Sequence, residues 1–254
     1  MRSMIYLDNT GSDPFGNLAL EEYLMTDDTR DIVMLWQNTP AVIVGRNQFT
    51  ENQVDRSYAE HHGIAVVRRL SGGGAVYHDK GNLNFTIIAR NGTSHKNDFS
   101  FFTRPILEVL ESYGVDAQFC GRNDLVVEGR KFSGNAQYHH GSALLHHGTI
   151  LWDSDLTVLA RVLKPKKRVV AREVDSHQSR VANLVDFVPP SVTLTRFKAD
   201  LVSRLIGETS HSTTATVPEV PQALLDKYRS ESWNWGTGPE ESDDADIESF
   251  PASC

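Results

Sequence analysis

Short runs of β-branched and aromatic residues recur along the chain, and most of them are bounded by Gly, Asn, Asp or Pro. This pattern is typical of β-strands. It predicts strands over residues 4–7, 32–37, 41–45, 64–70, 75–78, 83–88, 124–127 and 147–152.

Other stretches repeat apolar residues at helical spacing, which predicts helices over 14–25, 101–113, 155–163, 191–206 and 221–228. Asp13 is the expected N-cap of the first helix, and Gly114 follows the second. Several strands follow one another with no helix between them. This order favours an α+β fold, in which a mixed, largely antiparallel sheet is packed with helices.

The chain of 254 residues, 39% of them hydrophobic, is long enough to bury a sizeable core. We interpret residues 1–236 as one domain. Residues 237–254 are polar and acidic, which predicts a flexible tail. The formal net charge is −8, but the tail holds six acidic residues, and without them 25 basic residues face 27 acidic ones. A nearly neutral body argues against general nucleic-acid binding, which normally needs a basic surface.

The N-terminus has no apolar block of the kind that a secretory signal needs, and no long apolar run predicts a membrane span. The two cysteines, Cys120 and Cys254, are too few for a disulfide framework, which fits a reducing compartment. We therefore expect a cytoplasmic protein without a membrane partner.

The sequence SGGG, residues 71–74, lies between two predicted strands and indicates a glycine-rich hairpin. Its bare N–H groups could hold an anion, and Arg69 could add a charge-assisted contact. A hairpin with an ordinary turn explains the glycines equally well. The segment differs from the phosphate loop, because no Gly-Lys-Ser/Thr follows, and from the dinucleotide fingerprint in its glycine spacing.

The neighbourhood of these glycines resembles the signature of the lipoate–protein ligase family: a pair of arginines, then SGGGAVYHD, then GN. Further segments resemble other motifs of the family in the same order. They are LWQNTPAVIVGRNQ (35–48), GRNDLVVEGRKFSGNAQ (121–137), HHGTILWDSDL (146–156), SRVANLVDF (179–187) and SWNWG (232–236). The resemblance covers almost all of residues 1–236, and it implies the mixed-sheet catalytic domain of that family.

The resemblance implies that the chain makes an acyl-adenylate from lipoate and ATP. The lipoyl group would then pass to a lysine of a lipoyl carrier domain, in 2-oxoacid dehydrogenase acyltransferase subunits or the glycine cleavage H protein. Lys131 matches the family lysine that contacts both the acyl carbonyl and the phosphate. Its expected catalytic role is electrostatic.

The resemblance also assigns binding residues. For ATP these are the backbone stretch Gly74, Ala75, Val76 and Tyr77, together with Arg69, Asn82, Lys131 and Asp124. Asp124 is the candidate ligand of Mg²⁺, although an Asx turn before the strand explains it as well. The expected wall and mouth of the lipoate site are Trp36, Gly45, Arg46, Arg69, Ser71, Gly73, Lys131 and His147.

Longer family members continue into a small C-terminal domain after the tryptophan motif, and this sequence does not. A separate small accessory protein is therefore a candidate partner for adenylation, and a truncated chain is the alternative. Two other functions stay open. One is a lipoyl or octanoyl transferase or amidotransferase that needs no ATP but uses a cysteine nucleophile, a position that Cys120 does not match. The other is a lipoate-binding module without catalysis.

Overall fold

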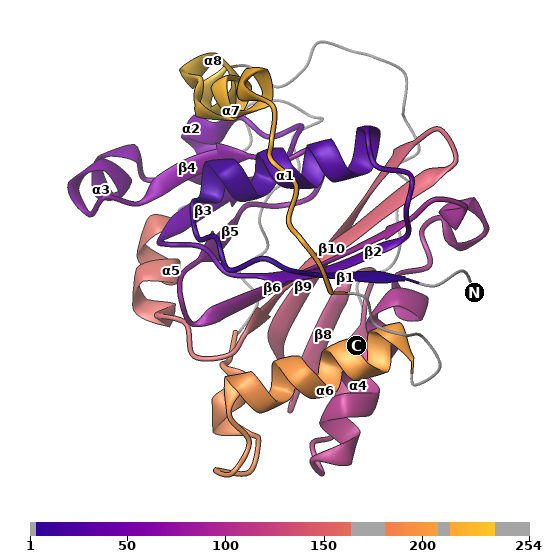
Figure 1. The fold of residues 1–254 in the computed structure, drawn as a ribbon. Helices are drawn as coiled ribbons and strands as arrows, with labels where there is room; N and C mark the ends of the chain where they lie inside the picture. Colours follow the sequence, from indigo (N-terminus) through magenta and orange to yellow (C-terminus); the bar gives the residue numbers. More distant parts are fainter. Residues whose placement is uncertain (1–3, 164–180, 208–213, 237–254) are drawn as a thin grey trace.

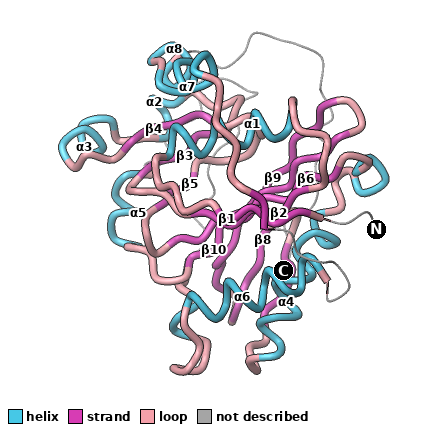
Figure 2. Tube along the Cα trace, viewed as in Figure 1, coloured by secondary structure: helices cyan, strands magenta, loops and turns pink. Residues whose placement is uncertain are grey.

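The computed structural model describes residues 4–163, 181–207 and 214–236, so the predicted tail at 237–254 lies outside the described residues. An eight-stranded sheet forms the centre, in the order β11-β1-β2-β6-β10-β9-β8-β7 (Figures 1 and 2). Strand β1 runs parallel to β11 and β2, and the other pairings are antiparallel. The strands are β1 (Ile5–Asp8), β2 (Ile32–Trp36), β6 (Asn82–Ala89), β7 (Ala117–Cys120), β8 (Asp124–Val127), β9 (Arg130–His140), β10 (Ala143–Leu151) and β11 (Thr214–Ala215).

A second sheet of three strands carries the glycine stretch. Its order is β4 (Ala65–Arg68), β3 (Ala41–Val44) and β5 (Val76–His78). The predicted glycine-rich hairpin is wrong, because β4 and β5 do not pair with each other. Each of them pairs with β3, the fully buried AVIV strand, and the glycines cross from one side of β3 to the other.

Helices cover both faces of the large sheet (Figure 1). Helix α1, α7 and the small sheet lie on one side, and α4 and α6 lie on the other. The α-helices are α1 (Pro14–Thr26), α2 (Thr50–Gln53), α3 (Arg56–His61), α4 (Phe99–Ser112), α5 (Leu156–Val162), α6 (Leu194–Ile206), α7 (Gln222–Arg229) and α8 (Glu231–Trp235). Two short 3₁₀ turns, η1 (Gly92–His95) and η2 (Leu184–Asp186), complete the described elements.

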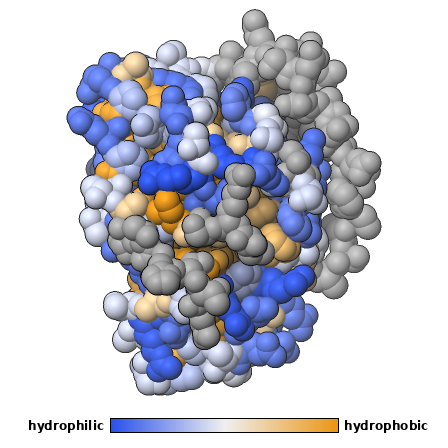
Figure 3. All heavy atoms as spheres, turned by 45° about the vertical axis from the view of Figure 1, so that its right-hand side comes forward, coloured by the Kyte–Doolittle hydropathy of each residue, from blue (hydrophilic) through white to orange (hydrophobic). Residues whose placement is uncertain are grey.

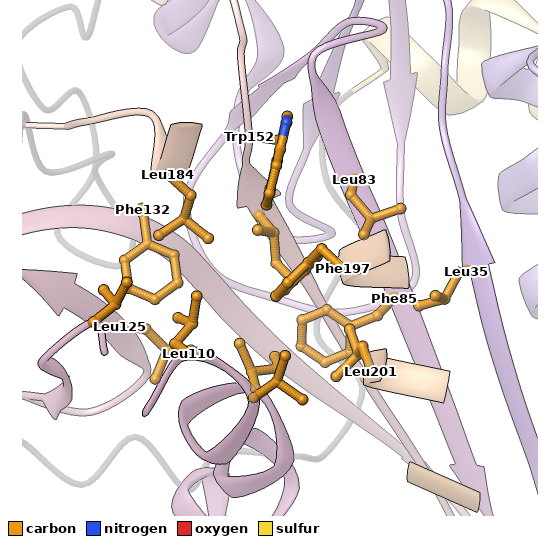
Figure 4. Packing of buried hydrophobic residues seen from close by; sticks show 14 of the residues in the cluster. Leu35, Leu83, Phe85, Leu110, Leu125, Phe132, Trp152, Leu184, Phe197 and Leu201 are labelled. Atoms are coloured by element: carbon orange, nitrogen blue, oxygen red, sulfur yellow. The ribbon is translucent and has the colours of Figure 1, made fainter. Parts of the chain in front are cut away.

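Two apolar clusters fill the space between these layers. The first joins the sheet to α4 and α6, and Figure 4 shows its side chains packing together, among them Phe85, Phe132, Trp152, Phe197 and Leu201. The second joins α1 to the opposite face of the sheet and includes Leu20, Leu24, Met34, Ile88 and Leu145. The sheet is therefore buried on both faces in its centre.

The helix and strand predictions are confirmed to within a few residues. Asp13 caps α1 as expected, since its carboxylate accepts a hydrogen bond from the Phe15 N–H. Helix α4 starts two residues before its prediction because Asp98 caps it by accepting from the Phe101 N–H. Strand β9 was not predicted, because its sequence RKFSGNAQYHH has neither β-branched residues nor regular alternation.

The face turned forward in Figure 3 is largely hydrophilic, with hydrophobic residues visible only in small areas. Within the described part of the chain, Val185 is the single exposed large hydrophobic residue. Among residues 4–163, 181–207 and 214–236, no helix combines the length and apolar character needed to cross a membrane.

Candidate active site

One row of side chains crosses the face of the large sheet that α1 covers. Asn84 on β6 is the cross-strand partner of Trp36 on β2 and of Thr149 on β10. The Thr149 hydroxyl lies 3.4 Å from the backbone N of Gly134 on β9. Cross-strand partners project from the same face. These residues therefore line a polar band across four strands, while the next residue on β6, Phe85, points into the core on the other face.

A buried hydrogen-bond network lies beside this band and joins α1, β10 and the glycine loop. The His147 Nδ1 lies 3.0 and 3.1 Å from the two carboxylate oxygens of Glu21, and its Nε2 lies 2.6 Å from the Ser71 Oγ. Glu21 also accepts from the Thr86 hydroxyl at 2.5 Å, and Thr86 accepts from the Trp36 indole N–H at 2.9 Å. Nδ1 faces a carboxylate, so the network assigns it the ring proton.

Arg69 continues the network on the other side of Ser71. Its Nε donates to the Ser71 Oγ at 2.9 Å, which leaves the Ser71 hydroxyl hydrogen for His147. The terminal nitrogens donate to the carbonyls of Ile43, Gly72 and Gly74 at 3.2, 2.5 and 2.9 Å. The guanidinium thus lies inside the glycine loop and holds its backbone, with four of its five N–H groups engaged by described residues. Burial lowers the pKa of Arg69 to about 10, and the charge of Glu21 opposes this shift.

The glycine loop packs against the turn that follows β3. A Cβ on Gly45 would lie 2.0 Å from the carbonyl oxygen of Gly73, so only glycine allows this approach. Gly73 itself has a φ of 90°, a conformation that side chains with a Cβ rarely adopt. The Arg46 N–H donates to the Ser71 carbonyl at 2.9 Å and closes the contact. The predicted lipoate-binding residues Gly45 and Arg46 are therefore in contact with the predicted lipoate-binding residues Ser71 and Gly73, and the two segments form one surface.

The side chain of Lys131 lies next to Gly134 of the same strand, β9. Its Nζ is 2.7 Å from the Asp124 Oδ1, and both side chains are about one quarter exposed, 27% and 26%. A Cβ on Gly134 would lie 2.9 Å from this Nζ. The β8–β9 register shifts between Leu125 and Val126, which marks a β-bulge. The missing side chain at Gly134 thus leaves the space that the Lys131 ammonium occupies. The Asp124 carboxylate holds this ammonium, which is still partly exposed to solvent.

The other arginine of the pair, Arg68, has a structural role. Arg68 is 1% exposed, and its guanidinium meets no carboxylate among the described residues. Instead it donates to the backbone carbonyls of Gly45, Arg46, Gln48, Trp233 and Gly236 and to the Thr50 hydroxyl, at 2.8–3.1 Å. It therefore fastens the SWNWG segment to the turn that lies against the glycine loop.

The structure brings several predicted site residues together and leaves others apart. Trp36, Arg69, Ser71 and His147 share one network, Gly45 and Gly73 are in contact, and Lys131 pairs with Asp124. Asn82 is fully buried and donates to Asn84 at 2.8 Å. Gly74, Ala75, Val76 and Tyr77 lead into β5 and run along it. The guanidinium of Arg46 lies over the ring of Tyr138, 5.7 Å from its centroid.

Four residues of this region were missed: Glu21, Arg68, Asn84 and Thr86. Glu21 is followed directly by Glu22 in helix α1, and acidic residues in helices are mostly exposed, so no local signal separated the two. Arg68 was identified only as part of a motif.

Residues 13–206 match the model of the lipoyl protein ligase A/B catalytic domain. The chain is 37% identical over 250 residues to lipoate-protein ligase LplJ of Bacillus subtilis, covering 93% of this chain and 75% of the relative. Its fold matches a bipartite lipoate protein ligase of Thermoplasma acidophilum, solved in a study of that ligase and its E2 lipoyl domain (TM-score 0.76, 28% identity, 94% and 98% of the two chains). It also matches lipoate-protein ligase A bound with ATP (TM-score 0.75, 28% identity, 92% and 98%). The chain therefore belongs to the lipoate–protein ligase family and contains its catalytic domain.

Proposed function

We propose that this protein activates lipoate with ATP and transfers the lipoyl group to a lysine of a lipoyl domain. The observation that carries the proposal is the placement of Lys131. Its ammonium is held by Asp124 on the same face of the sheet as the buried Trp36–Glu21–His147 network and the glycine loop. The matched relatives are named as lipoate ligases, and one of the matched structures holds ATP.

The reaction needs two anions, a carboxylate and a triphosphate, to approach one another. In the first step a lipoate carboxylate oxygen attacks the α-phosphorus of ATP, and pyrophosphate leaves. Lys131 offsets the negative charge that accumulates there. In the second step the acceptor amine attacks the acyl carbon, the bond from that carbon to the AMP oxygen breaks, and the amine proton leaves to solvent. Lys131 then stabilises the developing oxyanion.

The remaining assignments follow the sequence motifs. We assign the ATP site to the backbone of Gly74–Tyr77 with Asn82, and the lipoate wall to the surface formed by Trp36, Gly45, Ser71, Gly73 and His147. Arg69 serves both sites by fixing the loop backbone, and its one remaining N–H is available to a ligand.

Mg²⁺ is assigned to Asp124. The described residues contain no group of three or more His, Cys, Asp or Glu side chains that could hold a metal. A single carboxylate still fits Mg²⁺, which commonly takes one or two protein carboxylates together with substrate phosphates. Asp124 would hold the ion and Lys131 at once, and the ion would neutralise phosphate charge.

The proposed acceptors are the lipoyl domains of 2-oxoacid dehydrogenase complexes and the glycine cleavage H protein. The structural study of the T. acidophilum relative pairs that ligase with an E2 lipoyl domain, which supports this class of partner. That ligase is described as bipartite, so a separate small accessory protein is a further proposed partner. We place the reaction in the cytoplasm.

The test is an exchange of labelled pyrophosphate into ATP that depends on lipoate. Exchange followed by lipoylation of a lipoyl domain supports the ligase. If exchange is absent, preformed lipoyl-adenylate is supplied, because transfer then bypasses the first step. Transfer from an acylated carrier without ATP would instead identify a transferase, and binding of lipoate with neither reaction would identify a binding module.

A further inference from the structure

Asn82 and Asn84 form a buried amide pair in the polar band that crosses the sheet. Both lie on β6 and are 0% and 1% exposed, and the Asn82 Nδ2 donates to the Asn84 Oδ1 at 2.8 Å. The Asn82 Oδ1 and the Asn84 Nδ2 have no hydrogen-bond partner among the described residues. If both amides were turned over, the pair would still leave one acceptor and one donor unsatisfied.

An unpartnered buried amide is costly, because it loses its hydrogen bonds to water without replacement. Such a group in a binding site therefore indicates a polar ligand atom. Asn84 lies between the expected lipoate wall and the reacting end of the site. Its cross-strand partner on one side is Trp36, and on the other it is Thr149, whose hydroxyl lies next to Gly134 and so beside the Lys131 ammonium.

We propose that the Asn84 side-chain N–H donates a hydrogen bond to the carboxyl oxygen of lipoate, as a second donor in addition to Lys131. The inference rests on the proposed function. The acyl chain would lie along Trp36, and its carboxyl end would lie between Asn84 and Lys131. Asn82 holds the Asn84 amide in this orientation by occupying its oxygen.

The experiment measures binding of two ligands to the full chain by calorimetry. One ligand is lipoate, and the other is a dithiolane of equal chain length that ends in a methyl group. Asn84→Leu keeps the volume of the side chain and removes its N–H. It should weaken lipoate binding about ten- to hundred-fold, the effect of losing a hydrogen bond to a charged group, and change binding of the methyl-ended analogue less than about three-fold.

A second variant, Asn84→Asp, keeps the shape of the side chain and places a carboxylate near the ligand carboxylate. It should weaken lipoate binding more than Asn84→Leu does, and again leave the analogue unchanged. The matched control is Asn135→Leu, since Asn135 is also buried with an unpartnered Oδ1 but pairs with Gly148, beside Phe85 on the core face of the same sheet. This control should leave binding of both ligands within about three-fold and reports the cost of losing a buried amide.

Equal weakening of both ligands by Asn84→Leu would overturn the proposal, because Asn84 would then only shape the wall. Unchanged lipoate binding, or weakened ATP binding in place of lipoate binding, would overturn it as well. These results differ from failure of the proposed function, in which the unmodified chain itself would neither bind lipoate nor exchange pyrophosphate.

Discussion

The imidazole of His147 is joined to the carboxylate of Glu21 at 3.0 and 3.1 Å, and both residues are buried. Glu21 comes from α1 and His147 from β10, so the contact fixes the helix over the sheet. Because His147 also contacts Ser71, and Ser71 contacts Arg69, the position of the glycine loop depends on a carboxylate that lies 50 residues earlier in the chain.

Glu21→Gln removes the charge of this network and keeps its shape. The His147 and Thr86 donors lose a charged acceptor, and the buried Arg69 loses a nearby anion. Hydrogen bonds to charged groups contribute about 1.5–3 kcal/mol each, so we expect the free energy of unfolding in urea to fall by about 2–4 kcal/mol. The KM for lipoate should rise, because the loop is no longer held.

The control for this substitution is Glu22→Gln. Glu22 is the next residue of the same helix, and it pairs with Lys227 near the surface. Partly exposed ion pairs contribute about 1 kcal/mol or less, so this variant should stay close to the unmodified chain. Equal losses of stability in the two variants would contradict the importance given to the Glu21–His147 contact.

How far the sequence predicts this structure depends on whether a residue carries a local signal. The AVIV and DLVV strands and the Asp13 cap follow from β-branched residues and capping chemistry, and they appear where expected. Strand β9 has no such signal, because its conformation is imposed by pairing with β8 and β10. Glu21 was missed for the same reason, since only tertiary packing distinguishes it from other helical acids.

Arg69 illustrates the same limit within the site. Its position in the motif predicts proximity to the glycine loop, and the structure places it there. The sequence alone suggested a guanidinium directed at an anion, whereas in the structure most of its donors hold the backbone of the loop. Which of the two roles a buried arginine takes depends on the carbonyls that the fold places around it.

Lys131→Ala should abolish most of the acyl transfer and leave the fold intact. The ammonium is partly exposed, so its loss should change the melting temperature little. Loss of one preorganised electrostatic donor costs about 3–4 kcal/mol, or roughly two to three orders of magnitude in kcat. The measurement is the rate of lipoylation of a lipoyl domain, and a rate within a few-fold of the unmodified chain would refute the assigned role.

Gly134→Ala tests the position of the ammonium without removing it. The new methyl group would lie 2.9 Å from the Lys131 Nζ and 3.0 Å from its Cε, and the flexible end of the lysine can move away. We expect kcat to fall about ten- to hundred-fold, because small misplacements of a catalytic group are costly, with little change in stability. In a Lys131→Ala background the same substitution should have almost no further effect, and an additive loss would contradict this explanation.

Acid should destabilise the protein below about pH 6.5 through two buried histidines. Burial lowers the pKa of His78 to about 3, helped by the charges of Arg69 and His147, and burial also lowers the pKa of His146 to about 3. The unfolded chain then binds protons that the native state does not. The contribution of these two neutral histidines to the free energy of unfolding is therefore fully present above the unfolded pKa of about 6.5. It is lost as the pH falls toward 3, by up to about 1.4 kcal/mol per pH unit for each histidine.

His146→Phe should reduce this slope. His146 lies among Phe85, Phe99 and Phe102, so a phenyl ring suits the site and removes one titrating group. Urea unfolding at pH 6.5 and 5.0 measures the slope before most carboxylates begin to titrate. An unchanged slope in the variant would show that His146 does not account for the acid sensitivity.

Arg68→Lys should lower the stability of the fold far more than the exchange of one basic residue for another suggests. The guanidinium of Arg68 serves six acceptors in two segments of the chain, 45–50 and 233–236, and an ammonium has only three hydrogens to replace its donors. Burial without a carboxylate already lowers the pKa of Arg68. Several buried carbonyls would lose their donors, at about 1–3 kcal/mol each, so we expect the free energy of unfolding to fall by about 3 kcal/mol or more.

The local readout is hydrogen exchange of the Trp233 indole N–H, which donates to the Arg68 carbonyl at 2.9 Å and should exchange faster as α8 loosens. Arg56→Lys is the matched control, because Arg56 also reaches α8, through an exposed contact with Glu231 that should contribute little to stability. Slow indole exchange that persists in Arg68→Lys would mean that other contacts hold the SWNWG segment against the glycine loop.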